Sequence, residues 1–206
     1  WSHDGSSIVY THYDGPPVDG PPASSSIRVL DLASGESRVV AQSSGGAVFD
    51  NARWSADDST LVMQIDDFSG GGYELSVATL PAAGGEPTIL TDGTMFGGYP
   101  DFSPIDPTLI VFCTYDLGPF SETDNASDLY TIRTDGTDLT QMTDLGDGGP
   151  RATQPTFAAD GTSVLVTLVT PHSRELAIVT LGDPVPHAMG IPGTHFRPLG
   201  AAIPSS

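Results

Sequence analysis

Short runs of aliphatic and β-branched residues alternate along the chain with turns rich in Gly, Pro, Asp and Ser. The second run of each unit is almost continuously apolar, as from Thr60 to Ile65 and from Ser163 to Val169. A strand with one exposed face alternates between apolar and polar residues, so a continuous run predicts a strand buried on both faces. The sequence lacks the period of an amphipathic helix. The pattern therefore predicts an all-β fold of short antiparallel strands.

One short phrase occurs four times. In each copy an aromatic residue ends one β-run, a tight turn of Asp and Gly type follows, and an apolar run comes next. The aromatic residues are separated by 53, 48 and 55 positions, and a repeat of roughly 50 residues with about four strands is typical of a β-propeller blade. We expect the turn residues to be structural, because Asp hydrogen-bonds a turning backbone and Gly supplies positive φ. The phrase residues are Trp1, Asp4, Gly5, Trp54, Asp57, Phe102, Pro104, Phe157, Asp160 and Gly161.

These copies divide a single propeller domain, residues 1–206, into four predicted blades. Each blade is expected to be a four-stranded antiparallel meander, with a weak last strand near His187 in the fourth. The predicted units are about 1–47, 48–96, 97–150 and 151–194, and residues 195–206 begin a further blade.

At these phrases the chain resembles the TolB-like propellers, whose repeats are also called WD40-like or PD40 repeats. The resemblance rests on Phe102-Ser103-Pro104, on the other three turns, and on the blade ending Leu90-Thr91-Asp92-Gly93. It departs from the family at His3, where Pro is usual, and at Asp57-Asp58 and Ile105-Asp106-Pro107, where the turn glycine is missing.

The resemblance implies a ring of six or seven blades, whereas this sequence supplies about four. Two explanations stay open. The chain is part of a larger ring, or it closes alone or with a second copy, residues 196–202 then completing the blade begun at Trp1.

The charge restricts the partners. The formal net charge is −19, and all seven basic residues are Arg. Such a field repels nucleic acid and anionic membranes and is compatible with a basic protein, a basic peptide or a divalent cation. The single cysteine, Cys113, excludes a disulfide framework and a zinc–cysteine cluster. No apolar stretch is long enough for membrane insertion.

The sequence has no recognisable catalytic motif. It contains no Gly-x-Ser-x-Gly elbow, no His-Glu-x-x-His and no phosphate-binding glycine loop. The five histidines are scattered. We therefore predict that this chain is not itself an enzyme.

Acidic residues gather in one set of loops. In an antiparallel meander alternate connections emerge on opposite faces, and the longer connections share one face. Binding residues usually lie on such loops, so we predict a partner-binding surface there. Their oxygens are compatible with Ca²⁺, although no EF-hand-like run supports that ion; no other cofactor is indicated. The candidate residues are Asp66, Asp67, Asp116, Glu122, Asp124, Asp144 and Asp147.

The favoured interpretation is a non-catalytic binding or scaffold propeller that docks a protein or peptide. Its periplasmic or extracellular location is what the resemblance implies. The alternative is the gating propeller of a prolyl-oligopeptidase-type serine peptidase whose hydrolase domain lies outside this sequence. A lyase or hydrolase acting on acidic glycans is disfavoured, because the loops are acidic where a polyanion requires basic residues.

Overall fold

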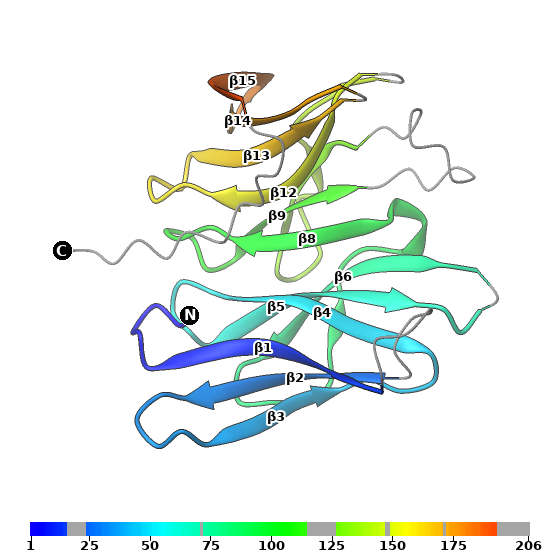
Figure 1. Ribbon diagram of the computed structural model, residues 1–206, viewed down its shortest axis with the longest axis vertical. Helices are drawn as coiled ribbons and strands as arrows, with labels where there is room; N and C mark the ends of the chain where they lie inside the picture. The colour runs from blue at the N-terminus through cyan, green and yellow to red at the C-terminus, as the bar shows by residue number, and fades with distance from the viewer. Residues whose placement is uncertain (16–23, 71, 115–126, 147–148, 171, 193–206) are drawn as a thin grey trace.

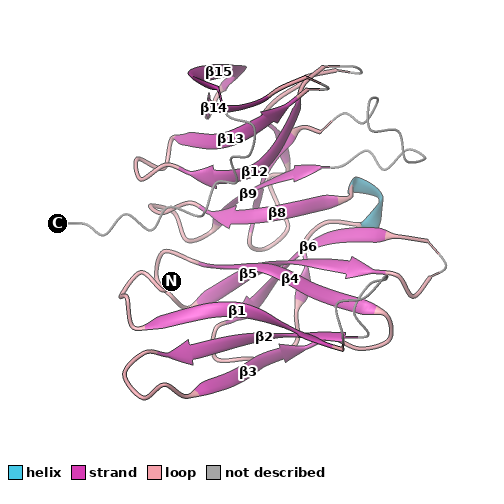
Figure 2. Ribbon diagram, in the orientation of Figure 1, coloured by secondary structure: helices cyan, strands magenta, loops and turns pink. Residues whose placement is uncertain are grey.

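A computed structural model describes residues 1–15, 24–70, 72–114, 127–146, 149–170 and 172–192. This part of the chain is built of antiparallel β-sheets, and its one helical segment is the short 3₁₀ turn η1 (Gly93–Met95). None of its helices could cross a membrane. The sheets follow one another in chain order, each lying beside the next (Figures 1 and 2). The prediction of an all-β fold is confirmed.

Each sheet is a meander in which neighbouring strands are consecutive in the sequence. The first sheet has three strands among the described residues, and the other three have four. The first sheet contains β1 (Ser7–Asp14), β2 (Ser24–Asp31) and β3 (Ser37–Gln42), and the second contains β4 (Ala47–Trp54), β5 (Thr60–Asp67), β6 (Glu74–Pro81) and β7 (Thr88–Ile89). The third contains β8 (Gly97–Phe102), β9 (Leu109–Thr114), β10 (Leu129–Arg133) and β11 (Thr140–Gln141), and the fourth contains β12 (Arg151–Phe157), β13 (Ser163–Val169), β14 (Arg174–Thr180) and β15 (Asp183–Pro192).

Two of the outermost strands, β7 and β11, have only two residues each, whereas β15 has ten. The weak strand predicted near His187 is therefore the longest strand among the described residues.

The core consists of apolar layers between consecutive sheets. Leu61 and Met63 of β5 pack toward the first sheet, while Val62 between them packs toward the third. Val111 and Cys113 of β9 likewise pack toward the fourth sheet. All five side chains are fully buried, as a continuously apolar strand predicts.

The aromatic residues of the second, third and fourth phrases pack against the preceding sheet. Trp54 joins the layer between the first and second sheets, Phe102 the next layer and Phe157 the third. Trp1 differs, because no earlier sheet exists among the described residues for it to pack against. Its side chain is 62% exposed.

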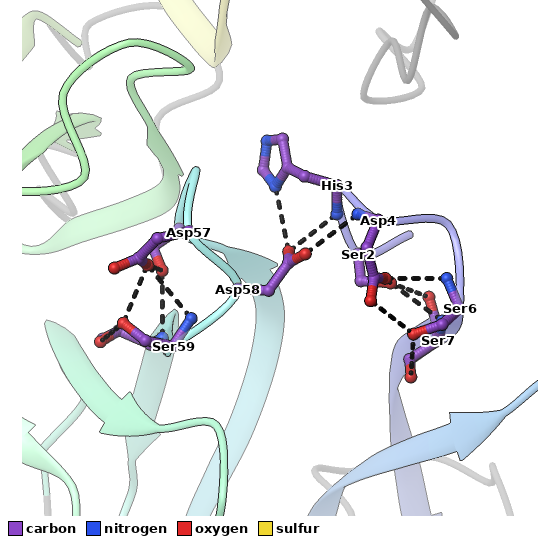
Figure 3. A network of polar contacts seen from close by, with 10 residues as sticks. Ser2, His3, Asp4, Ser6, Ser7, Asp57, Asp58 and Ser59 are labelled. Atoms are coloured by element: carbon purple, nitrogen blue, oxygen red, sulfur yellow. Dashed lines mark hydrogen bonds and ion pairs between the residues drawn. The ribbon is translucent and has the colours of Figure 1, made fainter.

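The repeated turns share one hydrogen-bond pattern. The Asp4 carboxylate accepts bonds from the Ser6 backbone N–H at 2.8 Å and from the Ser2 hydroxyl at 2.7 Å. Asp57 accepts equivalent bonds from Ser59 and Ser55 (Figure 3). These bonds lower the pKa of both carboxyls. The structural role expected for the turn aspartates agrees with this geometry.

Asp58 replaces the expected glycine in the second turn. Its φ of 57° lies in the left-handed region, beside 72° for Gly5 and 66° for Gly161. Asp tolerates this conformation better than most residues. Its carboxylate also accepts bonds from the backbone N–H groups of His3 at 2.7 Å and Asp4 at 3.0 Å (Figure 3). Asp58 thus ties the first blade to the second.

The first strands of the second, third and fourth sheets share a β-bulge. The register shifts between Asp50 and Arg53, and at the equivalent places in β8 and β12. Asn51, Tyr99 and Gln154 have φ values of 53°, 50° and 53°, and each lies three residues before the aromatic residue of its phrase. Non-glycine residues with positive φ are uncommon and often mark functional regions.

Candidate functional site

The two ends of the strands form two faces of the molecule. We call the face with the short β4–β5 and β8–β9 turns the turn face. The opposite face, where β5 and β9 end and β6 and β10 begin, is the loop face (Figure 1). The sequence predicted the binding residues on the loop face.

Asp66, at the end of β5, is the centre of a polar network on the loop face. Its carboxylate accepts hydrogen bonds from the Tyr73 hydroxyl at 2.5 Å and from the Gln64 side chain at 2.9 Å. The Gln64 side-chain oxygen accepts in turn from the Tyr99 backbone N–H at 3.1 Å. Burial raises the pKa of the Asp66 carboxyl, and these bonds oppose the shift. The network therefore fixes a half-buried carboxylate next to two bulged inner strands.

A second carboxylate, Asp50, lies beside it on β4. It accepts bonds from the Thr11 hydroxyl at 3.1 Å and from the Asn51 backbone N–H at 2.7 Å. Burial raises the pKa of the Tyr13 hydroxyl, and a hydrogen bond with Asp50 raises it further. Asp50 also contributes to the raised pKa of Asp66. The two carboxylates therefore share one electrostatic environment on neighbouring strands of the second sheet.

Aromatic rings surround this acidic centre. The rings of Phe68 and Tyr73 lie 5.0 Å apart between centroids, and those of Tyr73 and Phe96 lie 6.4 Å apart. Phe68 is 39% and Tyr13 44% exposed, so both offer apolar surface to a partner. We call the group Tyr13, Asp50, Asp66, Phe68, Tyr73, Phe96 and Tyr99 the acidic–aromatic patch.

The structure brings only part of the predicted set together. Asp66 belongs to the patch and Asp67 is its neighbour, with a pKa lowered by hydrogen bonds from the Ser69 side chain and backbone. Asp144 is exposed and lies after β11, and its charge acts on Tyr130. The remaining predicted residues lie outside the described residues; they are Asp116, Glu122, Asp124 and Asp147.

Sequence reasoning missed Asp50 and all the aromatic members. It counted charges in loops, whereas Asp50 lies inside strand β4, next to the bulge at Asn51. A usable signal was present, because Tyr13, Phe68 and Tyr73 flank the same loop-face connections as the acidic residues.

The described residues contain no group of three His, Cys, Asp or Glu side chains placed to hold a metal ion. Three of the scattered histidines pair with an aspartate instead: His3 with Asp58 at 3.2 Å, and His12 and His187 with Asp14 and Asp183. Calcium binding by the loop oxygens stays a prediction.

No family model and no curated protein matches the sequence. Solved structures do match. TolB from Acinetobacter baumannii has a TM-score of 0.68 at 14% identity, over 91% of this chain and 41% of that one. An oligogalacturonate lyase from Vibrio parahaemolyticus has a TM-score of 0.64 at 14% identity, over 91% and 50%. The β-propeller domain of the trilobed protease from Pyrococcus furiosus has a TM-score of 0.59 at 15% identity, over 86% and 51%.

At such low identity the likeness concerns the fold. The four sheets are arranged as β-propeller blades, with a fold similar to that of TolB, as the repeated phrases predicted. This chain spans less than two thirds of the length of the solved TolB proteins that it matches. The similar structures include both TolB and enzymes, so the likeness alone assigns no activity.

Proposed function

We propose that this propeller is a non-catalytic docking module that binds a protein or peptide partner through the loop face. The observation that carries the proposal is the acidic–aromatic patch. It combines exposed rings, which supply contact area at low entropic cost, with two carboxylates that favour a cationic partner. A cation near a tyrosine ring gains further attraction.

The partner most compatible with the patch is a segment with Lys or Arg next to an apolar residue. The overall charge of −19 steers such a segment toward the protein. We also propose a location in the cell envelope or outside the cell, supported by the likeness to TolB.

The test is a titration of the full chain with peptides that differ only in charge. We expect acetyl-Phe-Arg-Gly-Arg-amide to bind and its Glu-for-Arg counterpart not to bind. Asp66→Asn and Phe68→Ser should each weaken binding by about fivefold, on the order of 1 kcal/mol. Glu86→Gln removes a charge from the exposed turn face and should change nothing. If Glu86→Gln and Asp66→Asn weaken peptide binding equally, the loss reflects the overall charge and not the patch, and the proposal is refuted.

A second candidate is the propeller domain of a serine peptidase. It is favoured by the likeness to the trilobed protease and to a puromycin-hydrolysing peptidase of Mycobacterium tuberculosis, of which this chain spans 28%. The intact mass of the native polypeptide separates the candidates. A native chain well above 21.4 kDa with a Gly-x-Ser-x-Gly motif would support the peptidase. A native mass near 21.4 kDa would support the docking module.

A further inference from the structure

A groove of about 670 Å³ lies on the turn face between the first and second sheets. This volume is within the range of roughly 300–1,000 Å³ that ligand sites occupy. Asp31 and Arg38 line it from the first sheet, and Trp54 and Ala82 line it from the second. The groove opens on the opposite face from the acidic–aromatic patch. Binding of a ligand in the groove is therefore independent of partner binding at the patch.

The groove is rich in hydrogen-bond acceptors. Its lining includes four carboxylates and a single guanidinium. The guanidinium of Arg38 crosses between the sheets and donates to the carbonyl oxygens of Ala82 at 2.7 Å and Ala83 at 3.3 Å. The Ser6 hydroxyl donates to Asp4, which leaves its oxygen as an acceptor, whereas the Ser2 hydroxyl donates to Asp4 and already accepts from the Ser7 backbone N–H (Figure 3). The carboxylates are Asp4, Asp31, Glu36 and Asp58.

Glu36 differs from the other carboxylates. Asp4 and Asp31 accept hydrogen bonds from backbone N–H groups of their own turns, and Asp58 accepts one from the turn of the first blade. The Glu36 side chain is exposed and makes no hydrogen bond among the described residues. It is therefore the carboxylate most available to a ligand.

Trp54 supplies a second, independent observation. Its side chain is only 7% exposed and lines the groove, together with the apolar residues Val29 and Ala82. Its indole N–H is buried and has no hydrogen-bond partner among the described residues. A buried donor without an acceptor destabilises a protein, so an unpaired one next to a groove indicates a missing acceptor.

We propose that the groove binds a peptide segment that carries an arginine or lysine side chain. The cation lies among the carboxylates, where charge-assisted hydrogen bonds are strong. The aliphatic stem of that side chain packs on Val29 and Ala82. A backbone carbonyl oxygen of the segment accepts the hydrogen bond of the Trp54 indole. A free polyamine matches the carboxylates but has no acceptor for the indole, so the two sources of an alkyl cation are distinguishable.

The binding test uses the full chain and two-dimensional NMR titrations with acetyl-Gly-Arg-Gly-amide, acetyl-Gly-Gln-Gly-amide and spermine. We expect the arginine peptide to shift the Trp54 indole N–H resonance in a saturable way. The glutamine peptide should cause no saturable shift, and spermine should bind without moving the indole resonance. Since the chain has two tryptophans, Trp1→Phe assigns that resonance to Trp54.

Two variants locate the site. Glu36→Gln should weaken the arginine peptide by about fivefold through loss of a charge-assisted contact. Trp54→Phe should weaken the peptide by about threefold without affecting spermine, because only the peptide uses the indole. Phe occupies the equivalent place in the third and fourth sheets, at Phe102 and Phe157, so this variant is expected to fold.

The matched control is Glu175→Gln, which removes one exposed charge from β14 in the fourth sheet and should leave the affinity unchanged. The proposal is overturned if no saturable binding is found, or if Glu36→Gln and Glu175→Gln act equally. It is also overturned if Trp54→Phe weakens spermine and the peptide to the same extent.

Discussion

Single residues in the repeated turns differ in how closely a neighbouring blade approaches them. A Cβ on Gly5 would meet no atom within 4 Å, whereas a Cβ on Gly161 would come within 2.3 Å of the Ile105 side chain. Both glycines have positive φ, of 72° and 66°. The first and third blades thus contact their successors differently, through Asp58 at one joint and through Ile105 at the other.

We predict that Gly5→Ala lowers the free energy of unfolding by about 1 kcal/mol, the cost of a Cβ in the left-handed region. Gly161→Ala should cost more, because the Ile105 side chain must also move. Urea denaturation of both variants, with and without Ile105→Ala, measures the difference. If the difference persists in the Ile105→Ala background, contact with Ile105 is not its cause.

Asp101 provides a prediction about pH. It accepts hydrogen bonds from the Thr156 hydroxyl at 2.7 Å and the Phe157 backbone N–H at 3.0 Å, and so connects β8 to β12. Burial nevertheless raises the pKa of its carboxyl above the ordinary value of 3.8. A carboxyl with a raised pKa in the folded state binds more protons there than in the unfolded chain. Its ionisation therefore lowers stability as pH rises from 3.8 through the folded pKa.

Asp101→Asn should remove this loss while keeping an acceptor oxygen for Thr156 and Phe157. We expect the variant to gain stability relative to the unchanged protein as pH rises from 4 to 7, measured by urea denaturation at each pH. Asp160→Asn is the control. Backbone N–H bonds from Thr162 and Ser163 lower the pKa of Asp160, so its stabilising effect is lost only below 3.8. A constant difference for Asp101→Asn across this range would contradict the assignment.

At the scale of strands, the bulge of the inner strands makes its own prediction. Gln154 has positive φ in β12, and its side chain makes no hydrogen bond among the described residues. Gln154→Gly should therefore be neutral or stabilise the protein by up to about 1 kcal/mol, whereas Gln154→Val should cost about 1–2 kcal/mol. Thermal unfolding of the two variants distinguishes them. A stability order with Val above Gly would mean that the bulge is not required.

The sequence predicted the buried strands well because their apolar runs are continuous, which indicates burial on both faces. Leu61 and Met63 face one neighbouring sheet, and Val62 between them faces the other. Three consecutive apolar residues therefore indicate that both faces of this strand are buried. It also predicted the turn aspartates, whose hydrogen bonds are local. It did not predict Asp58 in a glycine conformation, because that choice depends on the backbone of His3 and Asp4 more than fifty positions away.

The candidate site was less predictable for the same reason. The sequence predicted Asp66 as a site residue from its place after an apolar run. Asp50 comes near it through the pairing of β4 with β5, and Tyr99 of the next sheet reaches the network by a hydrogen bond to Gln64. Neither contact can be read from residues adjacent in the sequence.

At the scale of the whole molecule, none of the described sheets covers the face of the first sheet that points away from the second. Ile8 and Tyr10 of β1 occupy the places that Leu61 and Met63 occupy in β5, seven and nine residues after the phrase aromatic. Leu61 and Met63 are fully buried against the preceding sheet, whereas Ile8 and Tyr10 are only partly buried. Trp1 adds a largely exposed ring. In the second, third and fourth sheets, the preceding blade covers the corresponding apolar face.

We therefore predict that the 206-residue chain, expressed alone, associates with itself through this face. Light scattering should give a mass that rises with concentration from 21.4 kDa toward twice that value. Trp1→Ser combined with Ile8→Ser should suppress the rise, because it removes the apolar area that association would bury. Val185→Ser removes exposed apolar surface from β15 and should leave the association unchanged. A mass that stays at 21.4 kDa at every concentration would mean that the blades of one chain satisfy this face without a second copy.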